Sequence, residues 1–199
     1  GFSALKAEPV IFDSTLVGTS IDAIVNRLEY LGFYDSHAEA ETQYTGKQAR
    51  VTYKVTPGKQ YPMKDISYQI ADKVMDSIWA RNRGKTLVKQ GDRLAESVLE
   101  QESQRLASVF RDNGYYGFSK NYFLFFADTT ATPDSSLLTV ELRDYTRKES
   151  PSAARPHTQY SIGNVSLVPQ GRLKVKSRFL QYLNLIEPNT PYSETVINN

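Results

Sequence analysis

Several residues have types that could carry chemistry, but each lacks the partners that its chemistry needs. Gly84-Lys85-Thr86 could end a phosphate-binding loop, yet that loop needs a glycine five residues before Gly84, where Trp79 stands. His37 and His157 stand alone in polar surroundings, without the clustered ligands of a metal site. The chain has no cysteine and no Gly-x-Ser-x-Gly nucleophile pattern. We therefore expect no catalytic residue, no metal and no cofactor.

The composition allows packed domains and disfavours two kinds of partner. The 199 residues permit one large domain or two to three small ones. The net charge is only +2 and no basic run is interleaved with aromatic residues, so we expect no nucleic acid. No run of about 18 apolar residues could form a membrane-spanning helix. The basic group Arg143, Arg147, Lys148 and Arg155 is expected to be solvated, with an anionic lipid surface as the alternative.

The elements that would position any site are found through a repeat. Residues 60–68 read QYPMKDISY, and residues 159–167 read QYSIGNVSL, with the same Gln-Tyr start and a shared serine. Each follows a segment in which apolar and polar residues alternate, at 51–55 and 138–142. Such alternation is typical of a half-buried strand. Each copy is therefore predicted to contain a strand, a loop and a second strand.

Helical segments repeat in the same order. Residues 21–36 and 103–118 each have apolar residues on one helical face, and each then has a glycine followed by two aromatic residues. Gly32 and Gly114 suit a left-handed helix C-terminal cap. A second helix is predicted after Ile70, and Asp92 is expected to cap the helix that follows it.

The repeated unit is thus strand, helix, helix, strand, strand. We predict an N-terminally truncated copy at 1–58, a complete copy at 59–146, a linker at 147–158 and the start of a further copy at 159–199. The linker is polar and contains Pro and Ser, so we expect an exposed loop or a mobile segment. The complete copy should bury Trp79 and a core of Ile66, Val74, Ile78, Leu99, Leu106, Phe110, Val140 and Leu142.

This unit resembles the POTRA domain of the BamA/TamA superfamily of outer-membrane assembly proteins, over essentially the whole chain. The stretches EPVIFDSTL, LGFYDS and VTYKVTPGKQYPMKDI look most like TamL, the lipoprotein type. The resemblance implies an α+β fold of tandem POTRA modules with the order β-α-α-β-β. Each module would be a small three-stranded mixed sheet with two helices on one face.

The resemblance also implies a function without catalysis. It suggests a chaperone-like periplasmic arm at the outer membrane of a Gram-negative cell, which docks unfolded outer-membrane proteins by β-augmentation. Accessory assembly proteins, such as a TamB-like or Bam-type partner, would also bind, and a β-barrel or lipid anchor would lie outside this chain. The alternative is a non-catalytic structural or interaction arm of a POTRA-bearing secretion or cell-division protein.

The docking site implied by the family is the second strand of each module, which lies at the sheet edge. In the complete copy this strand is NYFLFFADT, which has apolar residues on both faces. One interpretation is that the second face meets a partner, and the alternative is that neighbouring modules or the first helix cover it. The residues expected to bind are Asn121, Tyr122, Phe123, Leu124, Phe125, Phe126 and Ala127.

Overall fold

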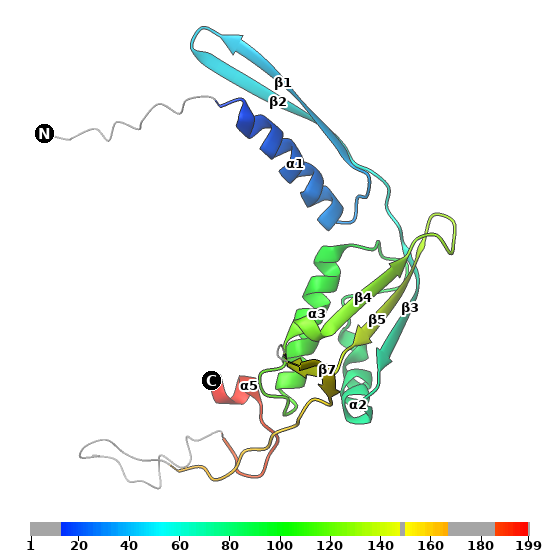
Figure 1. The fold of residues 1–199 in the computed structure, drawn as a ribbon, viewed down its shortest axis with the longest axis vertical. Helices are drawn as coiled ribbons and strands as arrows, with labels where there is room; N and C mark the ends of the chain where they lie inside the picture. The colour runs from blue at the N-terminus through cyan, green and yellow to red at the C-terminus, as the bar shows by residue number, and fades with distance from the viewer. Residues whose placement is uncertain (1–12, 148–149, 167–185, 199) are drawn as a thin grey trace, which may run out of the picture. The chain divides into compact units, whose positions relative to one another are not determined.

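The computed structural model describes residues 13–147, 150–166 and 186–198 (Figure 1). By internal contacts the chain divides into two compact units. Unit 1 consists of Gly1–Tyr61 with Arg93–Ser97, and unit 2 consists of Pro62–Asp92 with Val98–Asn199. The apolar stripe Val175, Phe179, Leu183 and Ile186 predicts a further helix, which lies outside the described residues except for Ile186.

Unit 1 contains a helix and a β-hairpin in its described part. Helix α1 (Thr15–Tyr30) is followed by strands β1 (His37–Thr45) and β2 (Gln48–Thr56), which pair antiparallel. The predicted cap of α1 is confirmed, because Gly32 has φ +88° and the Phe33 N–H donates to the carbonyl of Leu28 at 2.9 Å.

Unit 2 contains a three-stranded mixed sheet. Strand β3 (Met63–Ile70) is parallel to β5 (Ser136–Leu142), and β4 (Phe123–Asp128) is antiparallel to β5, which gives the order β3-β5-β4. Helices α2 (Lys73–Asn82) and α3 (Glu96–Arg111) lie between β3 and β4 in the chain, with the short 3-10 turns η1 (Arg83–Lys85) and η2 (Lys120–Tyr122).

Both helices pack on the same face of this sheet. Strand β5 alternates buried and half-buried residues, and Leu138, Val140 and Leu142 point into the core. On this face the Trp79 ring of α2 lies 4.6 Å from that of Tyr68 in β3, and the Phe110 ring of α3 stacks on Phe123 of β4 at 6.2 Å. The predicted α+β class, with a small mixed sheet and two helices on one face, is confirmed (Figure 1).

The predicted core is mostly confirmed, with one error. Buried members are Ile78, Leu99, Leu106, Phe110, Val140 and Leu142. Ile66 and Trp79 are half-buried. The prediction that Val74 is buried is wrong, because this residue is 50% exposed while its neighbour Met75 is 1% exposed.

The cap of α2 explains the error at Val74. Asp72 lies in extended backbone just before the helix, and its carboxylate accepts from the N–H groups of Val74 and Met75 at 2.8 and 3.0 Å. With the helix starting at Lys73, Met75 and Ile78 form the inward face and Val74 points outward. Asp92 is not a helix cap, since α3 begins only at Glu96.

Removing the Asp72 cap should cost stability. We expect Asp72→Ala to lower the free energy of unfolding by about 1 kcal/mol, because two amide donors at the start of α2 lose their acceptor. Asp92→Ala is the matched control and should change it by less than about 0.5 kcal/mol. Urea denaturation of the three proteins measures both effects. Equal losses in the two variants would contradict this account of the cap.

The predicted linker is not an exposed loop throughout. Strands β6 (Tyr145–Arg147) and β7 (Ser150–Arg155) form a short antiparallel hairpin there. Little in this segment predicts a strand, because proline and alanine are poor strand formers.

The segment that follows the linker repeats a hydrogen-bond pattern of the complete copy. The Met63 N–H donates to the carbonyl of Asp92, as the Ile162 N–H does to that of Thr190, both at 2.8 Å. Likewise the Gly91 N–H donates to the carbonyl of Met63, as the Asn189 N–H does to the carbonyl of Ile162.

The strand predicted at 159–167 is not formed in its described part. Only Ser161 makes a bridge there, with Pro191. No described strand offers this segment the pairing that β5 gives to β3. The described chain ends with the short helix α5 (Glu194–Asn198).

Candidate functional site

Strand β4 lies at the edge of the unit 2 sheet, with β5 on one side. In the part of the chain that the structure describes, no strand pairs with its other side. The Arg143 N–H donates to the carbonyl of Tyr122 at 2.9 Å, which fixes the phase of the antiparallel ladder. Bonded pairs then alternate along β4, so the backbone N–H and C=O groups that point away from β5 are those of Phe123, Phe125 and Ala127.

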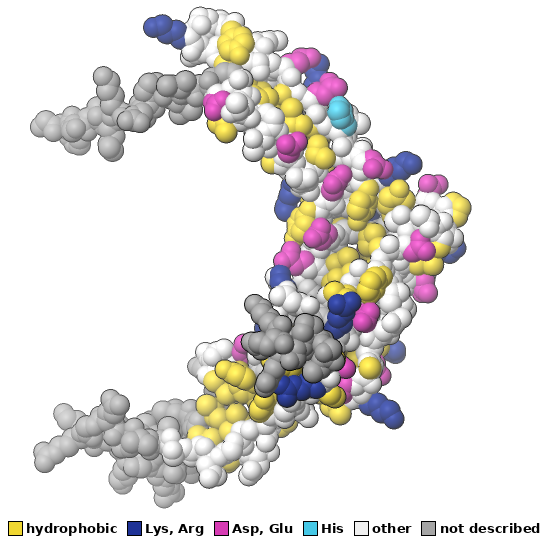
Figure 2. All heavy atoms as spheres, viewed as in Figure 1, with side chains coloured by type: hydrophobic (Ala, Val, Ile, Leu, Met, Phe, Trp, Pro, Cys, Tyr) yellow, Lys and Arg dark blue, Asp and Glu magenta, His cyan; other side chains and the backbone are white. Residues whose placement is uncertain are grey.

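The two faces of β4 have different surroundings. On the inner face Phe123 is 5% exposed beneath α3. On the outer face Leu124 is half-buried and Phe126 is 51% exposed, opposite Glu141 and Thr139 of β5. Figure 2 shows hydrophobic side chains at the surface in this region of unit 2. Core packing therefore explains the apolar residues on the inner face but not Phe126 on the outer face.

The predicted site residues fall into two elements. Phe123 to Ala127 lie in β4, whereas Asn121 and Tyr122 lie in η2, so the strand begins two residues later than predicted. Ser119 causes this difference. Its hydroxyl accepts from the Asn121 N–H at 3.2 Å and its carbonyl accepts from the Tyr122 N–H at 3.3 Å, which closes a turn before the strand.

The opposite edge of the sheet is less suited to docking. Strand β3 exposes Lys64 and Asp65 near its start. Charged residues on an edge strand disfavour pairing with another chain. From Phe123 to Ala127, β4 has neither a charged residue nor a proline.

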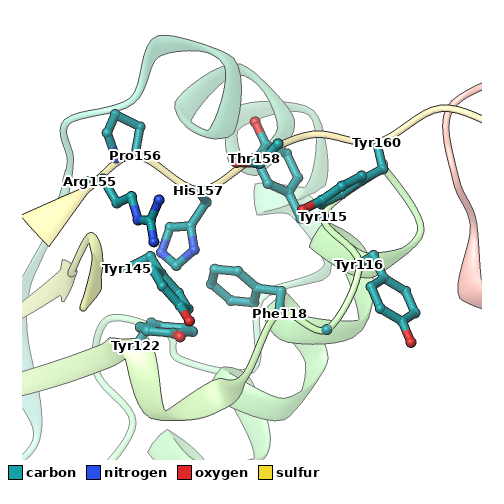
Figure 3. Close-up of a pocket in the computed structure, with 11 residues that line it drawn as sticks. Tyr115, Tyr116, Phe118, Tyr122, Tyr145, Arg155, Pro156, His157, Thr158 and Tyr160 are labelled. Atoms are coloured by element: carbon teal, nitrogen blue, oxygen red, sulfur yellow. The ribbon is translucent and has the colours of Figure 1, made fainter. Parts of the chain in front are cut away.

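An aromatic pocket of about 310 Å³ adjoins the start of β4 (Figure 3). We call it the Tyr122 pocket, and its main walls are Phe118, Tyr122, Tyr145, Arg155 and His157. The His157 Nε2–H donates to the carbonyl of Arg143 at 2.9 Å, which holds the imidazole in the wall. Burial raises the pKa of the Tyr122 hydroxyl, and so does nearby Tyr145.

Sequence reasoning missed this pocket. Its residues come from the turn after α3, from η2, from the start of β6 and from the linker, and only the structure brings them together. The available signals were the run of aromatic residues around Gly117 and an isolated histidine in the predicted linker. Neither signal specifies that the two segments meet.

The end of α3 holds the chain segment that follows the pocket. The backbone N–H of Tyr160 donates to the carbonyl of Gly114 at 2.7 Å, and the side-chain amide of Gln159 donates to the carbonyl of Asn113 at 2.8 Å. Burial would raise the pKa of Asp112, but hydrogen bonds from Thr195 and Ser193 outweigh it and lower that pKa.

Gly114 should be essential to this contact. It has φ +98°, and an added Cβ would lie 2.6 Å from Gln159 Cγ and 2.9 Å from the Tyr160 carbonyl oxygen. Gly117 has φ +70° but open space around its Cβ position, so it is the matched control for backbone strain. We expect Gly114→Ala to lower the free energy of unfolding by about 1–2 kcal/mol more than Gly117→Ala does.

Hydrogen exchange at the Tyr160 amide reports on the same contact. Exchange should accelerate in Gly114→Ala and stay near the parent rate in Gly117→Ala. The same protection of this amide in both variants would show that the contact does not depend on Gly114.

The described residues contain no helix long and apolar enough to cross a membrane. Across residues 13–147, 150–166 and 186–198, no group of three or more His, Asp or Glu side chains could hold a metal ion.

Comparison with known proteins gives likenesses among solved structures alone. No family model and no curated protein matches the chain. The crystal structure of Haemophilus influenzae BamA POTRA3-5 is 13% identical with a TM-score of 0.46, covering 91% of this chain and 65% of that one. The structure of Haemophilus ducreyi BamA lacking POTRA domains 1–3 is 14% identical with a TM-score of 0.41, covering 66% of this chain and 23% of that one.

A third likeness is to the N-terminal domain of Omp85 from Thermosynechococcus elongatus. It is 15% identical with a TM-score of 0.31, covering 94% of this chain and 69% of that one. This chain thus spans less than two thirds of the two Haemophilus structures. The strand order and helix packing described above define the α+β class of unit 2 independently of these likenesses.

Proposed function

We propose that this chain is a periplasmic POTRA arm of an outer-membrane protein assembly factor in the BamA/TamA superfamily. Its task is to dock unfolded outer-membrane proteins and partner proteins by β-augmentation at β4. The observation that carries the proposal is an edge strand with outward backbone groups at Phe123, Phe125 and Ala127 and an exposed apolar outer face. The work is non-catalytic.

The open edge of β4 supports a docking role because proteins normally protect such edges. Natural edge strands carry charges, prolines or bulges that prevent pairing with other chains. β3 follows that rule with Lys64 and Asp65 near its start, while β4 has a charged residue only at its last position, Asp128. An unprotected apolar edge promotes aggregation unless a binding partner occupies it.

The chemistry of the edge suits many clients. Main-chain hydrogen bonds supply affinity with little dependence on sequence, because every residue except proline offers the same donor and acceptor. The outer-face residues Leu124 and Phe126 would add contact with alternate apolar side chains of an incoming strand. Strands of outer-membrane proteins have such alternation.

The module order supports the assignment to POTRA arms. Unit 2 has the order β3, α2, α3, β4, β5, which is the order implied by the sequence resemblance. The hydrogen bonds of Met63 recur at Ile162, as expected for a further copy of the module. The proposal of a TamL-type protein with a TamB-like or Bam-type partner depends on the three sequence stretches given above.

Chemical-shift mapping tests the docking site. The ¹⁵N-labelled chain is titrated with peptides taken from outer-membrane β-strands. We expect the largest shifts at residues 123–127, together with slower exchange of the Phe125 and Ala127 amides as they gain acceptors. Shifts confined to the exposed faces of α2 and α3 would contradict the proposal. Absence of binding to every strand peptide would favour the purely structural arm.

A further inference from the structure

We propose that the Tyr122 pocket selects among docked strands by binding an aromatic side chain that has a carboxylate beside it. This inference rests on the proposed function, because the side chain belongs to the strand that pairs with β4. The edge would supply affinity and the pocket would supply selectivity.

The walls of the pocket suit a flat ring. The His157 ring lies 4.5 Å from that of Tyr122 and 4.8 Å from that of Phe118, and the Tyr145 ring lies 6.2 Å from that of Tyr122 (Figure 3). Aromatic pairs favour tilted and offset arrangements at such spacings. A volume of about 310 Å³ is at the low end for ligand sites, which suits one side chain better than a cofactor.

The charge of the pocket favours an acidic neighbour. Arg155 lies in the wall with its guanidinium 5.6 Å from the Tyr145 ring centre. No Asp or Glu lines the pocket, and Arg155 forms no ion pair within the described part of the chain. A carboxylate placed beside the bound ring would give this guanidinium a bidentate partner.

The position of the pocket ties it to the edge. Tyr122 directly precedes Phe123, the first residue of β4, whose backbone groups point outward. Tyr122 is the last residue of the η2 turn, and its carbonyl accepts from the Arg143 N–H where the β4–β5 ladder starts. A strand paired with Phe123 and Phe125 would therefore have one end beside the pocket.

Three matched strand peptides test the inference with the parent chain. The first has an aromatic residue next to a glutamate at the end paired with Phe123, the second replaces the aromatic residue with serine, and the third replaces the glutamate with glutamine. We expect the first to bind about tenfold more tightly than the second and several-fold more tightly than the third. Equal affinities for the first two peptides would overturn the inference.

Two variants separate this inference from the docking proposal. Arg155→Gln should abolish the preference for glutamate over glutamine while keeping the preference for the aromatic peptide. An unchanged preference for glutamate would overturn the role of Arg155. Ala127→Pro should weaken all three peptides alike, because it acts on the shared backbone pairing. If Ala127→Pro binds the peptides as tightly as the parent does, the proposal that strands dock at β4 is contradicted. If it weakens all peptides while the parent shows no preference among them, only the pocket inference fails.

Discussion

Replacing Phe110 with alanine is expected to lower the free energy of unfolding by about 3–5 kcal/mol. Phe110 is 0% exposed and its ring contacts Tyr115, Phe118 and Phe123 at 5.9, 5.0 and 6.2 Å. Its removal leaves a cavity between α3 and the sheet that these rings cannot fill without moving. Urea denaturation followed by circular dichroism measures the loss.

Val74→Ala is the control for Phe110→Ala. Both positions were predicted to be core from helical spacing, but Val74 is 50% exposed. We expect a change of less than about 0.5 kcal/mol at Val74. A loss below about 1 kcal/mol at Phe110, or similar losses at the two positions, would show that the core of unit 2 is not centred on Phe110.

Val74 shows what the spacing of apolar residues in a helix can predict and what it cannot. Spacing predicted that a helix follows β3, and α2 is there. It did not fix the rotation of the helix, because Val74, Met75, Ile78 and Trp79 offer two overlapping apolar faces. The cap at Asp72 and the fit of Trp79 against Tyr68 decide between them, and the second of these is a tertiary contact.

The prediction that β4 lies at the sheet edge came from the family resemblance and not from the residue pattern of the strand itself. The sequence of β4 is apolar on both faces, which is also typical of a central strand. The central strand of this sheet is β5, whose alternation of buried and half-buried residues looks like that of an edge strand with one wet face. Strand order depends on long-range pairing, which local sequence does not record.

The Tyr122 pocket could not be predicted for a related reason. Tyr122 and His157 are far apart in the chain, yet their rings lie 4.5 Å apart. The hairpin β6–β7 and the bond from His157 to the Arg143 carbonyl bring the linker back to the start of β4. A polar segment with two prolines gave no sign of this return.

Ala127→Pro is expected to weaken strand docking by at least about tenfold while leaving the fold intact. Ala127 is exposed and its N–H points away from β5, so proline removes a docking donor without breaking a bond of the β4–β5 ladder. Ala127→Ser is the matched control, because it keeps the backbone donor and changes the side chain only slightly. It should bind within about twofold of the parent.

The affinity of the Ala127→Pro variant for one outer-membrane strand peptide, measured by calorimetry beside the parent and Ala127→Ser, tests the docking role of β4 most directly. Unchanged unfolding curves for the three proteins establish that the fold is intact. Loss of binding in Ala127→Pro alone is the predicted result. Equal affinity of all three proteins for the peptide would show that docking does not use the backbone edge of β4, and would contradict the account.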